Sequence, residues 1–311
     1  MTQVSASMVK ELREKTGAGM MECKNALAQA GDIEGAIKIL REKGLAKAAK
    51  KSSRVAAEGL VSIAVQGSKA CMIELNCETD FVARNDDFKK LASDLVNIGL
   101  SFDASSSADC CQIEGSAING IKINNSTVES MIMDKIAHIG ENISLRRLAC
   151  FSDGDVYGHY LHSSNTIGVL VECKLSDASL SSNDDVKQAA KDLAMHIAAS
   201  NPLFISSNDV CESWKKAERE IFTAQVIASN KPANMIEKIV DGKMTKHMQD
   251  HCLLDQPFIK NPDLTINKML DELSKKTNAK LSVTKMVRYK VGEGMEKKED
   301  NFLDEVKKMV N

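Results

Sequence analysis

The sequence has few aromatic residues and almost no excess charge. Only 4% of its 311 residues are aromatic, and 43 acidic residues offset 41 basic ones, leaving a net charge of -2. Nonspecific nucleic-acid binding requires an excess of lysine and arginine, and single strands need aromatic rings on which their bases stack. We therefore expect no direct nucleic-acid binding as the main function.

Long apolar runs are also missing. No stretch approaches the roughly 18 apolar residues of a membrane-spanning helix. The N-terminus lacks the apolar core of a signal peptide and carries acidic residues early. These features predict a cytoplasmic protein that makes no contact with a membrane.

Catalytic signatures are lacking as well. The chain has no P-loop, zinc-protease or nucleophile-elbow motif. His159 and His162 lie three apart in a predicted hairpin and would point to opposite faces of a strand. The nine cysteines include no C-x-x-C pair and are typical of small apolar residues in a reduced protein. We expect no catalytic residue, cofactor or metal; a thiol or metal enzyme is the alternative.

The first 51 residues have helical periodicity. Glycines at 17, 31 and 44 are expected to end three short helices. A basic stretch from Lys43 to Arg54 follows and is interpreted as a helical or flexible linker. The alternative is that this stretch touches RNA, but no aromatic residues alternate with its lysines.

Two blocks of strands come next, each followed by a helix. The first has strands around 61–65 and 71–77, joined by a Gly67-Ser68 turn. After a Ser-rich segment, 101–127, and a helix ending at Gly140, strand patterns recur over 143–151, 156–161 and 166–174. This order predicts a duplicated α+β module.

Helical patterns dominate the rest of the chain. Residues 209–247 are broken once, at 229–232, which predicts a protruding helical hairpin. A strand over 281–291 is expected to close the second module, and residues 302–310 form an amphipathic pattern typical of a short helix.

Two segments do not fit an ordinary scaffold. Thr79-Asp80-Phe81-Val82 directly follows a strand; composition favours a buried Phe81, with an outward-facing loop as the alternative. Met20 and Met21 follow a glycine turn. They fit equally well an adaptable contact surface or an ordinary helix connection with Met20 buried.

Five ordered motifs resemble the elongation factor Ts family. They are VKELREKTGAGMMECKNAL at 9–27, LNCETDFVARN at 75–85, IGENISLRR at 139–147, MHIAASNP at 195–202 and VGEG at 291–294. They span nearly the whole chain in the family's order. The Ser-rich segment 101–127 has no clear family counterpart, and 271–285 is longer than usual.

The resemblance implies an α+β fold with five parts. They are a three-helix domain similar to ubiquitin-associated domains with its linker (1–54), a core N-subdomain (55–142), a related core C-subdomain (143–208 and 248–291), a coiled-coil hairpin (209–247) and a C-terminal helical module (292–311).

The resemblance also implies a function. The family promotes guanine nucleotide exchange on elongation factor Tu, binding its GDP-bound and nucleotide-free forms and disturbing the Mg²⁺ and phosphate site so that GDP leaves. No enzyme chemistry is implied, and a monomer, a homodimer and a two-to-two complex with the partner all remain open. The alternative is an RNA-binding, translation-associated protein that uses the basic linker.

Contact residues are implied one by one. Asp80 and Phe81 match an intruding pair near the partner's magnesium site, flanked by Thr79 and Val82. Met20 and Met21 match a contact of the N-terminal domain. Further matches are Ile139, Gly140, Glu141 and Asn142 as a second core contact, and, more loosely, His162 and Val240 toward other partner domains.

Overall fold

The structure is a computed structural model. It describes residues 4–16, 18–103, 111–123, 126–229 and 232–295. The helix expected over 302–310 and most of the expected C-terminal module lie outside the described residues, as does part of the Ser-rich segment. Within the described part of the chain, no helix is long and apolar enough to cross a membrane.

Three helices form the N-terminal unit: α1 (Ala6–Thr16), α2 (Met20–Ala30) and α3 (Ile33–Lys51). Leu12, Cys23 and Leu27 are buried at their centre. Gly31 ends α2 in the left-handed conformation, and Asp32 caps α3 by accepting from the Gly35 N–H at 2.6 Å. These local signals act as the sequence predicts.

The expected end of the third helix at Gly44 is wrong. Helix α3 continues to Lys51, so most of the basic stretch is helical. Gly44 lies where a side chain would meet the Ala137 methyl group, at 3.0 Å. The small residue thus allows α3 to pack against α6 (Val128–Ile139), and this packing outweighs the low helix propensity of glycine.

The first sheet has the strand order β1-β2-β6-β3. Its strands are β1 (Glu58–Gln66), β2 (Lys69–Cys77), β6 (Ile143–Phe151) and the short β3 (Ile113–Glu114). Gly67 and Ser68 join β1 to β2 as a two-residue turn, as predicted. Helices α5 (Asp86–Gly99) and α6 bury their apolar sides on this sheet.

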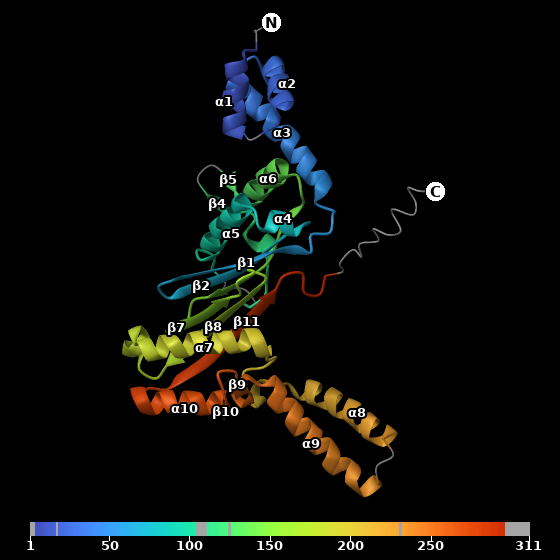
Figure 1. Ribbon diagram of the computed structural model, residues 1–311, viewed down its shortest axis with the longest axis vertical. Helices are drawn as coiled ribbons and strands as arrows, with labels where there is room; N and C mark the ends of the chain where they lie inside the picture. Colours follow the sequence, from blue (N-terminus) through green and yellow to red (C-terminus); the bar gives the residue numbers. More distant parts are fainter. Residues whose placement is uncertain (1–3, 17, 104–110, 124–125, 230–231, 296–311) are drawn as a thin grey trace.

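The second sheet has the order β11-β8-β7. Its strands are β7 (Val156–Leu161), β8 (Ile167–Leu175) and β11 (Leu281–Lys290), with α7 (Asp184–Ser200) and α10 (Ile266–Thr277) on its outer face. Met72, Phe151 and Leu170 are buried where the two sheets pack together. The core is therefore a helix, sheet, sheet, helix stack (Figure 1).

The remaining elements are short connections. The strands among them are β4 (Lys122–Ile123), β5 (Ser126–Thr127), β9 (Pro257–Phe258) and β10 (Asn261–Thr265). The 3₁₀ helices are η2 (Gly115–Ile118), η3 (Ala178–Ser182), η4 (Ser207–Asp209) and η5 (Leu253–Asp255).

The expected boundary between core subdomains at residue 142 is wrong. Strand β6 pairs with β2 in the first sheet, with Ile73 opposite Leu148 and Cys77 opposite Ile143. The apolar cross-strand pairs complete the first core. Their burial places β6 in the first sheet, although β6 is followed in the chain by the strands of the second sheet. The first sheet therefore extends to Phe151, and the second begins with β7.

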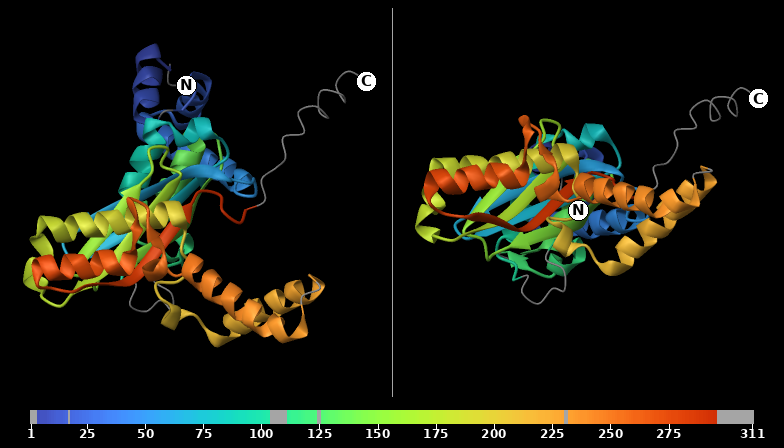
Figure 2. Two further views of the ribbon diagram at one scale, coloured as in Figure 1. Left: turned by 60° about the horizontal axis from the view of Figure 1, so that its bottom comes forward. Right: turned by 90° about the horizontal axis from the view of Figure 1, so that it is seen from below.

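A helical hairpin projects from the second sheet's side of the molecule (Figures 1 and 2). It consists of α8 (Glu212–Ala228) and α9 (Ala233–His251). At its base the Trp214 and His247 rings stack with centroids 5.3 Å apart. The N-terminal helices lie at the opposite end of the molecule (Figure 1).

A fully buried carboxylate fastens the end of the last strand to the first sheet. Glu74 on β2 accepts from Arg147 Nε at 2.6 Å and from Arg146 Nη1 at 3.0 Å. The strand register shifts by one residue here, and this bulge brings both arginines to one carboxylate. The Gly292 N–H, in the turn after β11, donates to the same carboxylate at 2.9 Å.

Glu74→Gln is expected to lower the free energy of unfolding by about 3–5 kcal/mol, because it keeps the shape of the side chain but removes the buried countercharge of Arg147 and leaves only the half-exposed Glu293, 3.9 Å away. Urea denaturation measures this loss. Glu129→Gln, at an exposed glutamate on α6, is the matched control and should change stability by less than about 0.5 kcal/mol. A loss below about 1 kcal/mol for Glu74→Gln would contradict the assigned role of this network.

Candidate partner-binding surface

The segment after β2 forms a short projecting helix, α4 (Asp80–Ala83), where a loop was expected. Thr79 caps it: the Thr79 hydroxyl oxygen accepts from the Val82 N–H at 3.4 Å. We call residues 79–83 the tip. Phe81 is 81% exposed, so its burial, which composition favoured, is wrong. A single exposed apolar side chain is common on protein surfaces, so what distinguishes Phe81 is the capped turn of helix that holds it outward.

The neighbours of Phe81 explain its outward direction. Val82 and Ala83, which follow Phe81 in the same turn of helix, are partly buried against the first core. This turn therefore has its inner side on the core and leaves Phe81 facing water. Asp80 is half-exposed and pairs with Arg84 at 2.9 Å. The tip therefore exposes an aromatic side chain at Phe81 and, at the preceding position, a carboxylate that is paired with Arg84.

A second segment, which we call the joint (Gly140, Glu141 and Asn142), lies against the tip. Gly140 ends α6 with φ +89°, and the Lys51 ammonium at the end of α3 donates to its carbonyl. Both carboxylate oxygens of Glu141 accept from Thr79, one from the N–H at 3.0 Å and one from the hydroxyl at 2.7 Å.

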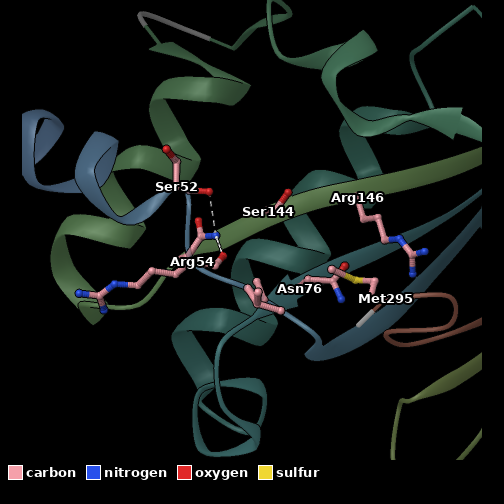
Figure 3. Close-up of a pocket in the computed structure, with 9 residues that line it drawn as sticks. Ser52, Arg54, Asn76, Ser144, Arg146 and Met295 are labelled. Atoms are coloured by element: carbon pink, nitrogen blue, oxygen red, sulfur yellow. Dashed lines mark hydrogen bonds between the residues drawn. The ribbon is translucent and has the colours of Figure 1, made fainter. Parts of the chain in front are cut away.

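Asn142 completes the joint from inside the protein, where it is 5% exposed, so the partner contact expected of its side chain is wrong. Its side-chain amide donates to the carbonyls of Ser52 at 3.3 Å and Arg54 at 2.7 Å, the bonds drawn dashed in Figure 3. Its backbone N–H donates to Glu78 at 2.6 Å. The joint thus connects the linker after α3 with the tip.

Lys51 and Glu78 hold the joint in place through hydrogen bonds to Gly140 and Asn142, and no local pattern predicts either contact. Each makes its contact with a residue far away in the chain, so no local spacing reveals the pair. Lys51 and Arg54, both in the basic stretch, have partners within the protein, the latter Glu78 at 3.6 Å. The stretch is therefore partly used in holding the fold together.

A pocket of about 360 Å³ opens beside the joint, between the linker, the first sheet and Met295 (Figure 3). Arg146 on its wall is paired with Glu74 and also donates to the Glu293 carbonyl at 2.6 Å. The positive charge on this wall is therefore balanced within the protein, and the pocket belongs to the scaffold of the joint.

Met20 and Met21 begin α2 and are 62% and 65% exposed. The burial of Met20 that an ordinary helix connection would require is thus wrong. Nearby, a groove of about 990 Å³ runs between the N-terminal helices and α6, with Glu22, Leu40 and Met131 among its lining residues. The methionine pair lies on the N-terminal unit, and the tip lies on the core.

The other candidate residues differ in exposure. Ile139 and Gly140 are half-exposed at the end of α6, and His162 is exposed after β7 with its Nδ1 2.9 Å from the Ser164 hydroxyl. Val240 is a correction: it is 2% exposed, buried in the helical hairpin as is Val226. Its side chain packs the hairpin and is not available to a partner.

A family model described as Elongation factor TS matches residues 78–293, more than half of the chain. The matched span includes the tip, the joint and the turn after β11. It leaves out Met20 and Met21, so their proposed role depends on the resemblance of residues 9–27 alone.

The cysteines offer little reactive chemistry. Among the described residues, six cysteines are buried and no group of three or more His, Cys, Asp or Glu side chains could hold a metal ion. Burial and the nearby Glu141 carboxylate raise the pKa of Cys77 to about 12. Cys211 is exposed, and the Ser213 hydroxyl lowers the pKa of its thiol. Cys110 lies outside the described residues.

Alkylation by iodoacetamide at neutral pH is expected to label Cys211 at least about a hundredfold faster than Cys77, because the thiolate is the reacting species and Cys77 is both buried and protonated. Mass spectrometry of tryptic peptides measures the two rates. Cys211→Ser should remove its fast signal and leave the rate of Cys77 unchanged. Equal rates in the native protein would contradict the burial of Cys77.

Proposed function

The chain belongs to the elongation factor TS family, whose members are nucleotide exchange factors for elongation factor Tu, and we propose how it acts on that partner. The protein binds elongation factor Tu in its GDP-bound form and inserts Phe81 between partner helices near the magnesium site. The displaced helices disturb the Mg²⁺ and phosphate contacts. GDP then leaves, and the nucleotide-free partner can bind GTP.

The observation that carries this proposal is the exposed Phe81 on a capped, anchored tip. Mg²⁺ demands near-ideal octahedral geometry and bridges phosphate oxygens, so small displacements of its ligands weaken it. A rigid apolar wedge displaces helices more effectively than a flexible loop, because little binding energy is spent on ordering it.

Exchange of this kind requires no acid, base or nucleophile. It requires a surface that binds the nucleotide-free partner more tightly than the GDP-bound one. The coupling is reciprocal: GDP weakens binding of this protein by the same factor by which the protein weakens GDP binding. The proposed activity is therefore one of differential binding.

The remaining residues have supporting roles in the proposal. Asp80 orients the wedge, with Thr79 and Val82 shaping the turn that carries it. Met20 and Met21 bind the nucleotide-binding domain of the partner, Ile139 and Gly140 extend the core contact, and His162 reaches another partner domain. The protein acts as a monomer, as a homodimer or in a two-to-two complex with its partner.

Phe81→Ala is expected to slow stimulated GDP release about tenfold, since a desolvated aromatic anchor is worth about 1–2 kcal/mol. Release of fluorescent mant-GDP from elongation factor Tu, with excess unlabelled nucleotide, measures the rate. Phe81→Leu should give an intermediate rate because it keeps part of the apolar volume.

Val65→Ala is the matched control for this experiment. Val65 is also exposed and lies near the turn of the same β-hairpin, at the end away from the tip. Val65→Ala should leave the rate of GDP release unchanged, and Val65→Ala and Phe81→Ala should both keep the wild-type midpoint of urea unfolding. If folded Phe81→Ala stimulated GDP release at the wild-type rate, the proposed insertion of Phe81 between partner helices would be refuted.

Replacing Met20 and Met21 together by alanine is expected to weaken the complex with nucleotide-free elongation factor Tu about five- to tenfold, by removing two apolar contacts. Calorimetric titration measures the affinity. Side-chain replacement is a sharper test than removal of residues 1–51, because α3 packs on α6 and its loss would uncover that helix. Glu34→Ala, exposed on α3, is the control, and unchanged affinity of the methionine variant would remove this contact from the proposal.

A further inference from the structure

We propose that Glu141 is a positioning residue that holds the Phe81 tip in its projecting conformation, acting through Thr79 rather than by touching the partner. The inference depends on the proposed exchange function, in which the tip is the working surface. It replaces the partner-binding role that the family resemblance implies for Glu141 and gives that residue an intramolecular one.

The first argument is the direction of the hydrogen bonds. The Thr79 hydroxyl donates its only hydrogen to Glu141 Oε1 at 2.7 Å. The lone pairs of the Thr79 hydroxyl oxygen then face the Val82 N–H, and this oxygen accepts from that N–H at 3.4 Å. The carboxylate thus selects the hydroxyl orientation that caps the turn of helix carrying Phe81.

The second argument is that Glu141 also fixes the backbone where the tip begins. Its other oxygen accepts from the Thr79 N–H at 3.0 Å. A planar carboxylate that accepts two bonds from one residue restrains both the position and the rotation of that residue. Thr79 is the last point of the chain before the exposed turn, so the restraint passes directly to Phe81.

The third argument is that Glu141 is itself held on both sides. Lys51 donates to the Gly140 carbonyl on one side, and the buried Asn142 bonds to Ser52, Arg54 and Glu78 on the other. The residue is half-buried, and both of its carboxylate oxygens already have bonds within the protein. A group placed in this way serves as an anchor.

The test measures mant-GDP release from elongation factor Tu over a range of concentrations of the full-length protein. Glu141→Ala should lower the maximal stimulated rate about five- to tenfold, the effect of losing one charge-assisted cap, and raise the half-saturating concentration by less than about twofold. Glu141→Gln should recover part of the rate, because its carbonyl oxygen can still accept from the Thr79 hydroxyl.

Amide hydrogen exchange supplies a readout independent of the partner. In Glu141→Ala the N–H groups of Thr79 and Val82 should exchange at least about tenfold faster, while those in the centres of β2 and β6 keep their protection. Glu129→Ala, which removes an exposed glutamate from α6, is the matched control and should change neither exchange nor release.

A double-substitution cycle separates failure of this inference from failure of the proposed function. If Glu141 acts through the tip, Glu141→Ala should change the rate less than about twofold in the Phe81→Ala background. An undiminished loss in that background, or unchanged exchange at Val82, would overturn the positioning role. A Phe81→Ala variant with the wild-type rate would instead refute the wedge and leave the exchange data on Glu141 standing.

Discussion

The antiparallel pairing of β2 with β6 is the constraint on which the candidate surface depends. Cys77 at the end of β2 lies opposite Ile143 at the start of β6. Residues that follow β2 must therefore meet residues that precede β6, which brings Thr79 against Glu141. Farther along the same strands, Glu74 lies opposite Arg147. The pairing of these two strands, with a one-residue bulge between Glu74 and Leu75, thus sets both the anchor of the tip and the buried ion pairs.

The sequence predicts the features that nearby residues decide. The Gly67-Ser68 turn and the ends of α2 and α6 at Gly31 and Gly140 need only a few neighbouring residues, and the structure has them. Pairing of β2 with β6 joins segments far apart in the chain, and chain order alone suggested a different partner. Gly44 failed as a helix end for the same reason, since contact with Ala137 on α6 overrides a local preference.

Phe81 shows how composition and resemblance can point in opposite directions. Burying a phenylalanine is worth about 1.5–3 kcal/mol, so composition favours burial. The resemblance implies an exposed contact instead, and the structure leaves the ring in water. The exposure depends on the inward Val82 and on an anchor supplied from beyond α6, and no local pattern contains that information.

An exposed anchor suits a mechanism driven by binding, because the free energy of burying its apolar surface is gained only when a partner binds. If the tip were flexible, part of that energy would go into ordering its own backbone. The Gly140 carbonyl of the joint also accepts a hydrogen bond from Lys51 at the end of α3, and α3 packs on α2, the helix that carries Met20 and Met21. In the proposed complex, the tip and the methionine pair would therefore bind the partner from one connected scaffold, so that strain would fall on the partner rather than on this protein.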